Sequence, residues 1–231
     1  MHEKQYVYLL CAILYGVALS WSCSHAERWL RSPQCKPQPR LKLSDAHFCT
    51  GDVLLWSSPP TLRTDVEKLV CGSQHTHVAL VFVDASGHAF AWECVRSGHQ
   101  VVRITPHFVQ KHGTCFWRRI SKPVDSAALE RFILQNMHQP YSFDLWRGVV
   151  RRWCSTLYLP QSVESRAFAK PRFCSELVAD SLVAVGALDF TLCTDLTPVT
   201  VMPHDFSDSC TSALPWTHGF GLSGEVQLMP V

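Results

Sequence analysis

The alternation of apolar and turn-forming residues in the middle of the chain predicts a small antiparallel sheet. Gly51-Asp52 is a turn pair that leads into the apolar run Val53 to Trp56, which has the length and composition of a buried strand. Further on, two β-rich segments flank the turn residues Asp84 to Gly87 and form a hairpin. The predicted strands are residues 53–56, 77–83, 88–93, 101–104 and 115–120.

Two later segments repeat apolar residues with the period of a helix. Asp125 is placed to cap the first helix, and Pro140 ends it. The second helix begins near Cys174, and Gly186 supplies its C-terminal stop. The apolar stripes are Leu129, Phe132, Ile133 and Met137 in the first helix and Leu177, Val178, Leu182 and Val185 in the second. We therefore expect an α+β fold in which helices pack on the sheet.

The N-terminus differs from the rest of the chain. Residues 6 to 21 form an almost uninterrupted apolar run, which predicts a signal peptide or an N-terminal membrane anchor over residues 1–26. Sixteen residues are few for a bilayer core, which needs about 20, and Ser24-His25-Ala26 offers the small residues that a signal peptidase prefers. Either reading sends the chain into the secretory pathway, as a secreted or membrane-anchored protein.

Composition divides the remainder into a linker, one domain and a tail. Residues 27–50 are mostly polar and contain several prolines, as a linker does, whereas residues 51–210 hold all the predicted strands and helices. Residues 211–231 form a turn-rich C-terminal tail. A chain of 231 residues is long enough for one well-buried domain with such extensions.

The charge balance argues against a nucleic-acid partner. Lys and Arg number 21 and Asp and Glu number 19, a difference of only two, and no long basic run is present. Hydrophobic residues make up 47% and charged residues 17% of the chain, which is typical of a globular protein.

Cysteine use allows two hypotheses. Nine of the eleven cysteines follow the leader, so four disulfides would leave one reactive thiol; alternatively, several are free and buried as small hydrophobes. The sequence has no C-x-x-C and no H-x-x-x-H pair, so we expect no metal site and no cofactor.

A candidate nucleophile lies at the start of the second helix. Cys174, in Arg172-Phe173-Cys174-Ser175, occupies the first helical turn, where unpaired backbone amides favour a thiolate and can also hold an oxyanion. A cysteine nucleophile needs a base, and the base needs a partner that orients it. His77 and Glu93 lie at the two ends of the predicted hairpin and can fill these roles.

The hairpin register decides whether this pair can meet. A three-residue loop, in which Val83 pairs with Gly87, places His77 directly opposite Glu93. A four-residue loop turns Glu93 to the other face. Gly87 can adopt a positive φ, which favours the three-residue form.

The ordered set G-D-V-L-L-W, T-H-V-A-L-V, W-E, P-Y-S-F-D and F-C-S-E-L-V resembles the circularly permuted NlpC-type papain-like enzymes of the YiiX/YebB-like group. The resemblance covers roughly residues 51 to 206. It implies a permuted papain-like fold, a small antiparallel sheet or barrel with the nucleophile helix packed against it. It further implies that Cys174 is the nucleophile, His77 the base and Glu93 the third member, and it suggests that Tyr141 lines the substrate site.

These expectations together predict a cysteine-dependent hydrolase that cleaves an amide, either a peptide or an N-acyl bond, through a thioester. A lipid acyltransferase or phospholipase with the same triad is one alternative, because the leader would allow membrane association. A non-catalytic membrane or secreted binding module with the same fold is another. The expected partner is a small-molecule, peptide or lipid amide or ester.

Each candidate residue also has a structural interpretation. Cys174 can be a buried or disulfide-bonded helix residue, and Glu93 a solvated carboxylate at a strand end. His75 is a rival for the base, although His77 is preferred because it directly adjoins the apolar strand. Tyr141 can be an ordinary core residue.

Overall fold

The sheet and its helices lie in the larger of two units, Met1–Gln38 and Pro39–Val231, into which the chain divides. The computed structural model describes residues 38–61, 64–65, 68, 74–142, 172–193, 196–209 and 214–230. The predicted leader lies outside the described residues. In the part of the chain that is described, no helix is long and apolar enough to cross a bilayer.

Seven strands form one open sheet in the order β1-β7-β6-β2-β3-β4-β5. The sheet is not closed into a barrel, so the barrel form of the prediction is not found. All neighbouring strands are antiparallel except β1 and β7, which pair in parallel. The strands are β1 (Arg40–Lys42), β2 (Val53–Ser57), β3 (His77–Val83), β4 (Ala89–Val95), β5 (Gly98–Arg103), β6 (Thr114–Arg118) and β7 (Val226–Met229).

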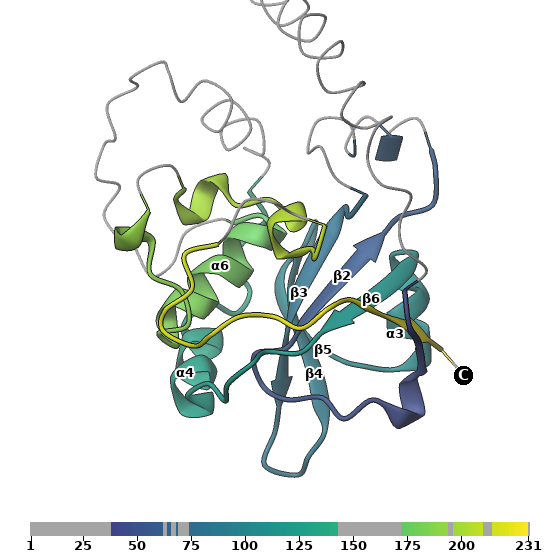
Figure 1. Cartoon of the computed structure of the whole chain (residues 1–231), viewed down its shortest axis with the longest axis horizontal. Coiled ribbons are helices and arrows are strands. Elements are labelled where there is room, and N and C mark those ends of the chain that lie inside the picture. The colour runs from purple at the N-terminus through teal and green to yellow at the C-terminus, as the bar shows by residue number, and fades with distance from the viewer. Residues whose placement is uncertain are drawn as a thin grey trace, which may run out of the picture. The chain divides into compact units, whose positions relative to one another are not determined.

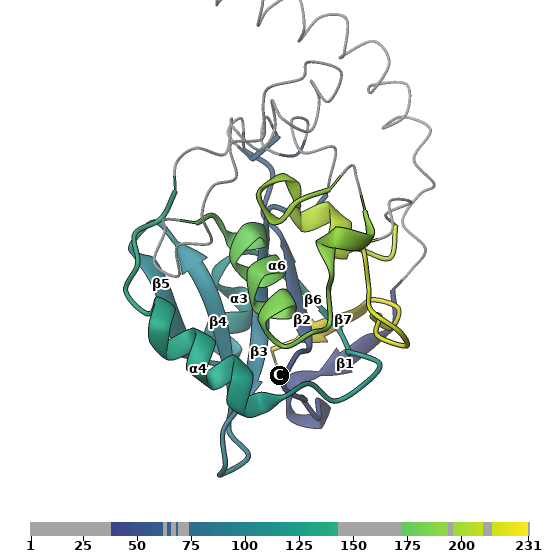
Figure 2. The same cartoon turned by 90° about the vertical axis from the view of Figure 1, so that its left-hand side faces the viewer.

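Helices cover both faces of this sheet. The longer helices α4 (Ser126–Asn136) and α6 (Cys174–Ala184) lie on one face, and the short helix α3 (Pro106–Lys111) lies on the other (Figures 1 and 2). Four 3-10 turns are also described, at Leu43–Asp45, Phe190–Leu192, Pro198–Thr200 and Pro203–Phe206. The α+β prediction is thus confirmed.

Each face of the sheet has its own apolar core, because side chains alternate along a strand. On the α6 face, Val78 and Leu80 of β3 pack with Trp92 of β4 and with Leu177 and Val178. On the α3 face, the intervening residues pack together with the helix; they include Ala79, Val81, Ala91, Trp56 and Phe108. His77 and Glu93 alternate with the first set, so both belong to the face that carries α3.

The two predicted long helices form where the apolar period places them. Asp125 caps α4, its side chain accepting a hydrogen bond from the Ala128 amide at 2.9 Å. Helix α6 begins at Cys174 and ends at Ala184, and Gly186 follows with a φ of 72°, as in a helix ending on a left-handed residue. These boundaries agree with the sequence pattern, and they place the Cys174 side chain at the helix N-terminus.

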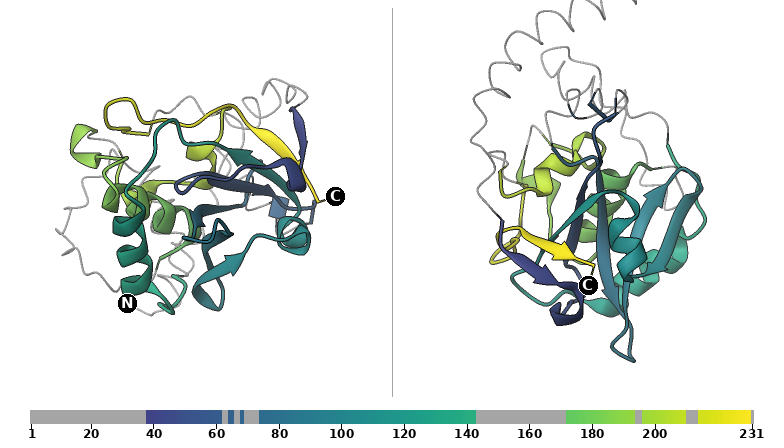
Figure 3. Two further views of the ribbon diagram at one scale, coloured as in Figure 1. Left: turned by 90° about the horizontal axis from the view of Figure 1, so that it is seen from below. Right: turned by 90° about the vertical axis from the view of Figure 1, so that its right-hand side faces the viewer.

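Two strands of the sheet come from segments outside the predicted domain of residues 51–210. Strand β1 lies in the predicted linker and β7 in the predicted tail, and they are neighbours in the sheet (Figure 3). Strand β7 also pairs with β6. Short, partly exposed strands such as these carry a weak apolar alternation, so their partners decide their structure.

The cysteines in the described part of the chain are free thiols and not members of the disulfide network that one hypothesis predicted. Five of the nine cysteines after the leader are free: Cys49, Cys94, Cys115, Cys174 and Cys193. Four disulfides among nine cysteines are therefore not supported. The alternative of buried free cysteines fits Cys94, Cys115 and Cys174, all of which are buried.

A buried carboxylate fastens the C-terminal segment to the domain. Glu225 accepts hydrogen bonds from the Ser207 hydroxyl at 2.7 Å and the Asp208 amide at 3.1 Å. Its Oε1 atom also lies 3.2 Å from Nε2 of His75. Because both side chains of this His–Glu pair are almost fully buried, the contact holds the residues before β3 against those before β7.

Replacing Glu225 with glutamine should lower the free energy of unfolding at neutral pH and remove part of its acid dependence. Burial alone raises the pKa of Glu225, but His75, Ser207 and the Asp208 amide bring it down to about 2, from an ordinary value of 4.5. The carboxylate therefore stabilises the fold fully above about pH 4.5 and loses this effect as the pH falls toward 2, an effect on the order of 3 kcal/mol.

Urea unfolding of the wild type and Glu225→Gln between pH 3 and pH 7 measures this contribution. The stability difference between the two proteins should shrink steadily as the pH falls. A difference of the same size at both ends of that range would show that the ionised carboxylate is not what stabilises this contact.

Candidate active site

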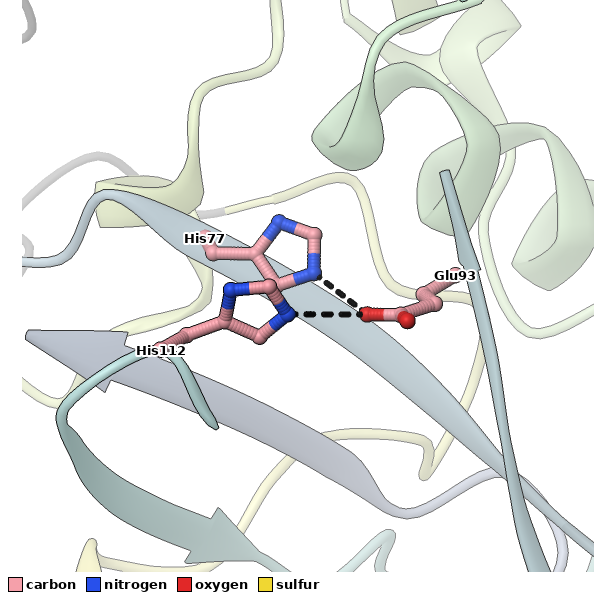
Figure 4. A group of neighbouring side chains, drawn as sticks. All are labelled: His77, Glu93 and His112. Carbon is pink, nitrogen blue, oxygen red and sulfur yellow. Dashed lines mark hydrogen bonds and ion pairs between the residues drawn. The ribbon is translucent and has the colours of Figure 1, made fainter. Parts of the chain in front are cut away.

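Glu93 is the centre of a buried polar cluster on the face of the sheet that carries α3. Its side chain is fully buried. Oε2 lies 2.8 Å from Nε2 of His77 and 3.5 Å from Nε2 of His112 (Figure 4). Oε1 accepts a hydrogen bond from the Gln100 amide at 2.7 Å and lies 3.5 Å from Nζ of Lys111. Four side chains thus converge on one carboxylate.

The hairpin brings His77 to Glu93 by a register different from the predicted one. Val83 pairs with Ala89, so the loop has five residues instead of three. Continuing the Leu80–Trp92 pairing puts Glu93 opposite Ala79, and His77 lies diagonally across. Because the register differs from the prediction by two residues, an even number, the same faces are kept. The predicted contact forms although the predicted register was wrong.

Glu93 sets the protonation of the His77 ring. Burial alone raises the pKa of Glu93, but the nearby imidazoles of His112 and His77 and the Gln100 amide hold it well below its usual range. An ionised carboxylate only accepts hydrogen bonds, so Nε2 of His77 carries the proton. Burial lowers the pKa of His77, and Glu93 only partly opposes this. A neutral ring with its proton on Nε2 offers a basic lone pair at Nδ1.

Cys174 is a free thiol at the first position of α6, only 7% exposed. Burial raises its pKa to about 11, although the amides of Val78, Ser175 and Cys174 itself act in the opposite direction. The resting group is therefore a thiol, which departs from the expectation of a thiolate stabilised by the helix. The Val78 amide that acts on the thiol directly follows His77 on β3. Cys174 itself packs in the core on the α6 face, whereas His77 faces α3 and hydrogen-bonds Glu93. The structure therefore brings His77 and Glu93 together, but it shows no hydrogen bond between the described side chains of Cys174 and His77.

His75, the rival for the base, has a different carboxylate partner. Its Nε2 faces Glu225 at 3.2 Å, and its ring packs edge-on against Phe116 with centroids 5.3 Å apart. Of the two histidines, His77 is the one whose Nε2 contacts Glu93.

Tyr141 lies next to the segment that leads into the nucleophile helix. It forms an isolated parallel bridge with Arg172, and the Ser142 amide donates to the Arg172 carbonyl at 2.9 Å. The Tyr141 side chain is half-buried and packs against the core that contains Cys174. A role in substrate binding stays a prediction, since residues 143–171 lie outside the described part of the chain.

Three members of the Glu93 cluster were missed by the sequence analysis. His112 and Lys111 lie at the end of α3, a helix that was not predicted, although Thr105-Pro106 is a recognisable start: the Thr105 side chain accepts a hydrogen bond from the Phe108 amide at 3.2 Å. Gln100 pairs directly with Glu93 across β4 and β5. Only the strand pairing identifies it.

No family model and no curated protein matches the chain. A solved structure that resembles it is titled metalloprotein yiiX from Escherichia coli O157:H7, DUF1105. The alignment covers 78% of this chain and 98% of that one, with 12% sequence identity and a TM-score of 0.47. The chain is therefore a distant structural neighbour of YiiX.

Proposed function

We propose that this protein is a cysteine-dependent hydrolase that cleaves an amide bond through a thioester on Cys174. The observation that carries the proposal is the 2.8 Å contact between His77 and the fully buried Glu93. The amide of the next residue, Val78, acts on the thiol of Cys174, a free cysteine at a helix N-terminus. A cysteine, a neutral imidazole and a carboxylate that orients it are the parts of a nucleophile activated by a base.

The proposed reaction begins with a proton transfer, because burial raises the pKa of Cys174 to about 11. For this step Nδ1 of His77 has to come within hydrogen-bond reach of the Cys174 sulfur; it then accepts the thiol proton as sulfur bonds to the carbonyl carbon of the substrate. The amides of Cys174 and Ser175 act on the same sulfur, and amides placed in this way can also donate to the tetrahedral oxyanion. Glu93 then stabilises the positively charged imidazolium.

The remaining steps return the enzyme to its starting state. The imidazolium gives its proton to the leaving amine, the carbon–nitrogen bond breaks, and a thioester remains on Cys174. Water then attacks the thioester, and His77 accepts a proton from the attacking water. The acid leaves, the imidazolium reprotonates sulfur, and one water has been consumed for each amide cleaved.

Electrophile labelling of the purified protein tests the assignment of the nucleophile. Cys174 is buried and has a raised pKa, so an unassisted thiol there should react more slowly than the exposed Cys49. If His77 activates it, iodoacetamide should modify residue 174 faster than residue 49 at pH 7. Peptide mass spectrometry gives both rates in one sample.

Matched variants complete that test. Cys174→Ser should remove the fast-labelled peptide, and Cys49→Ser should leave it in place. Slower labelling at residue 174 than at residue 49 would rule out an activated nucleophile and favour the binding-module alternative. Once labelling is shown, turnover of peptide and N-acyl amides is compared with turnover of phospholipids. Turnover of the amides identifies the amidase, and turnover of the phospholipids identifies the lipid acyltransferase or phospholipase.

A further inference from the structure

His77, His112 and Glu93 form a group of donor atoms with the spacing of a metal site. One nitrogen of each imidazole and one carboxylate oxygen all lie within 4.8 Å of one another. Both Nε2 atoms point at the same atom, Oε2 of Glu93, at 2.8 and 3.5 Å (Figure 4). The three side chains come from β3, β4 and the end of α3, so the sheet and helix together hold the group.

The His112 nitrogen of this group lacks a good hydrogen bond. Nε2 of His112 is buried and makes no hydrogen bond, and its 3.5 Å approach to Glu93 is too long for a good one. A buried nitrogen with a polar contact as long as this one is poorly satisfied, and that costs free energy. An ion between His112, His77 and Glu93 would satisfy this nitrogen.

The donor set selects the kind of ion. Two imidazoles and one carboxylate suit Zn²⁺, which often has three protein ligands and an open fourth position. Bonds of about 2.0–2.1 Å place tetrahedral ligand atoms about 3.3 Å apart. The 2.8 Å contact between His77 and Glu93 would therefore widen by about half an ångström. Nε2 of His112, now 3.5 Å from Oε2 of Glu93, would move slightly closer to it.

We propose that His77, His112 and Glu93 bind one Zn²⁺ ion, and that the bound ion prevents His77 from acting as the base. The second part of this proposal rests on the proposed hydrolase function, whereas the first part does not.

Inhibition follows from the two nitrogens of the His77 ring. In the metal-free protein the Nε2 proton points at Glu93, and Nδ1 has the free lone pair. When Zn²⁺ bonds to Nε2, that proton leaves and the neutral ring carries its single proton on Nδ1 instead. A protonated Nδ1 cannot accept the proton of Cys174, so zinc exchanges one tautomer for the other.

Lys111 is the charge that opposes a cation here. Its Nζ lies 3.5 Å from Oε1 of Glu93, the oxygen that does not face the histidines, and its side chain is 38% exposed. The ammonium can therefore swing into solvent when the ion binds. Removing it in Lys111→Ala should tighten zinc binding, because a like charge is lost from the site.

Zinc titration of the chelator-treated full-length protein tests the site without any measurement of activity. A chromophoric zinc chelator competing with the protein reports its affinity. His112→Gln should weaken the tightest site at least tenfold, as the loss of a ligand requires. The matched control His107→Gln changes an exposed histidine near the start of α3 and should keep the wild-type affinity. Equal affinities in the wild type and His112→Gln would overturn the proposal.

The Cys174 thiol has to be excluded as a ligand. Cys174→Ser should bind zinc as tightly as the wild type, and X-ray absorption of the loaded protein should show nitrogen and oxygen at about 2.0–2.1 Å without sulfur at about 2.3 Å. Weaker binding in Cys174→Ser, or a sulfur shell, would contradict the three-residue site.

The effect of zinc on labelling separates the two proposals. Saturating zinc should slow iodoacetamide labelling of residue 174 at least tenfold in the wild type, and it should have no such effect in His112→Gln. Slow labelling in the metal-free wild type would reject the hydrolase and leave the binding result intact. Zinc that binds through His112 yet leaves fast labelling unchanged would reject only the inhibition.

Discussion

Replacing His77 with alanine should slow labelling and turnover at Cys174 by about 10² to 10⁴, the usual contribution of a positioned general base. The reason is the raised pKa of the Cys174 thiol, about 11, which leaves little thiolate at neutral pH without a base. Rates of iodoacetamide modification at residue 174 measure the effect directly, and a hydrolysed amide substrate measures it under turnover.

Two further variants show whether the loss belongs to the His77 ring. Glu93→Gln should also slow the reaction, because an amide cannot stabilise the imidazolium as a carboxylate does. His75→Ala removes a buried histidine two residues away that pairs with Glu225 instead, and after a check of its thermal stability it should label like the wild type. If labelling at residue 174 slowed strongly in His75→Ala and not in His77→Ala, His75 would be the base instead of His77.

Replacing Leu177 with alanine should lower the free energy of unfolding by about 2–5 kcal/mol, the range for a truncated buried leucine. Leu177 is fully buried on the first turn of α6, where it packs against the sheet in the same core as Cys174. Urea denaturation followed by circular dichroism gives the difference. The cavity left behind would lie directly beneath the helix end that positions the nucleophile.

Leu134 is the matched control for this prediction. It lies on α4 and is 69% exposed, so Leu134→Ala should change stability by no more than about 0.5 kcal/mol. Similar losses in the two variants would mean that α6 is not seated on the sheet as described.

Much of the secondary structure follows from local patterns in the sequence. The apolar period over Leu129 to Ile133 and the cap at Asp125 were enough to predict α4, and the start of α6 at Cys174 follows in the same way. The run from His77 to Val83 is the strand β3 at its predicted boundaries. These signals are local, because helix and strand periods depend on residues close together in the chain.

The strand register was beyond a local pattern. Gly87 does adopt a positive φ of 80°, as predicted, but in a five-residue loop in which Asp84 accepts hydrogen bonds from the amides of Ser86 and His88. These bonds, and the fit of both strands into the sheet, set the pairing. His77 and Glu93 meet because the error in register was an even number of residues.

The sequence by itself therefore determined the α+β class, the main strands and helices, and the candidates Cys174, His77 and Glu93. Only the tertiary structure decided which side chains surround that carboxylate: His112 and Gln100 are 19 and 7 residues away from it along the chain, and no short spacing motif connects them. Their convergence on Glu93 depends on the pairing of β4 with β5 and on the packing of α3 against the sheet, contacts that form only when distant segments fold together.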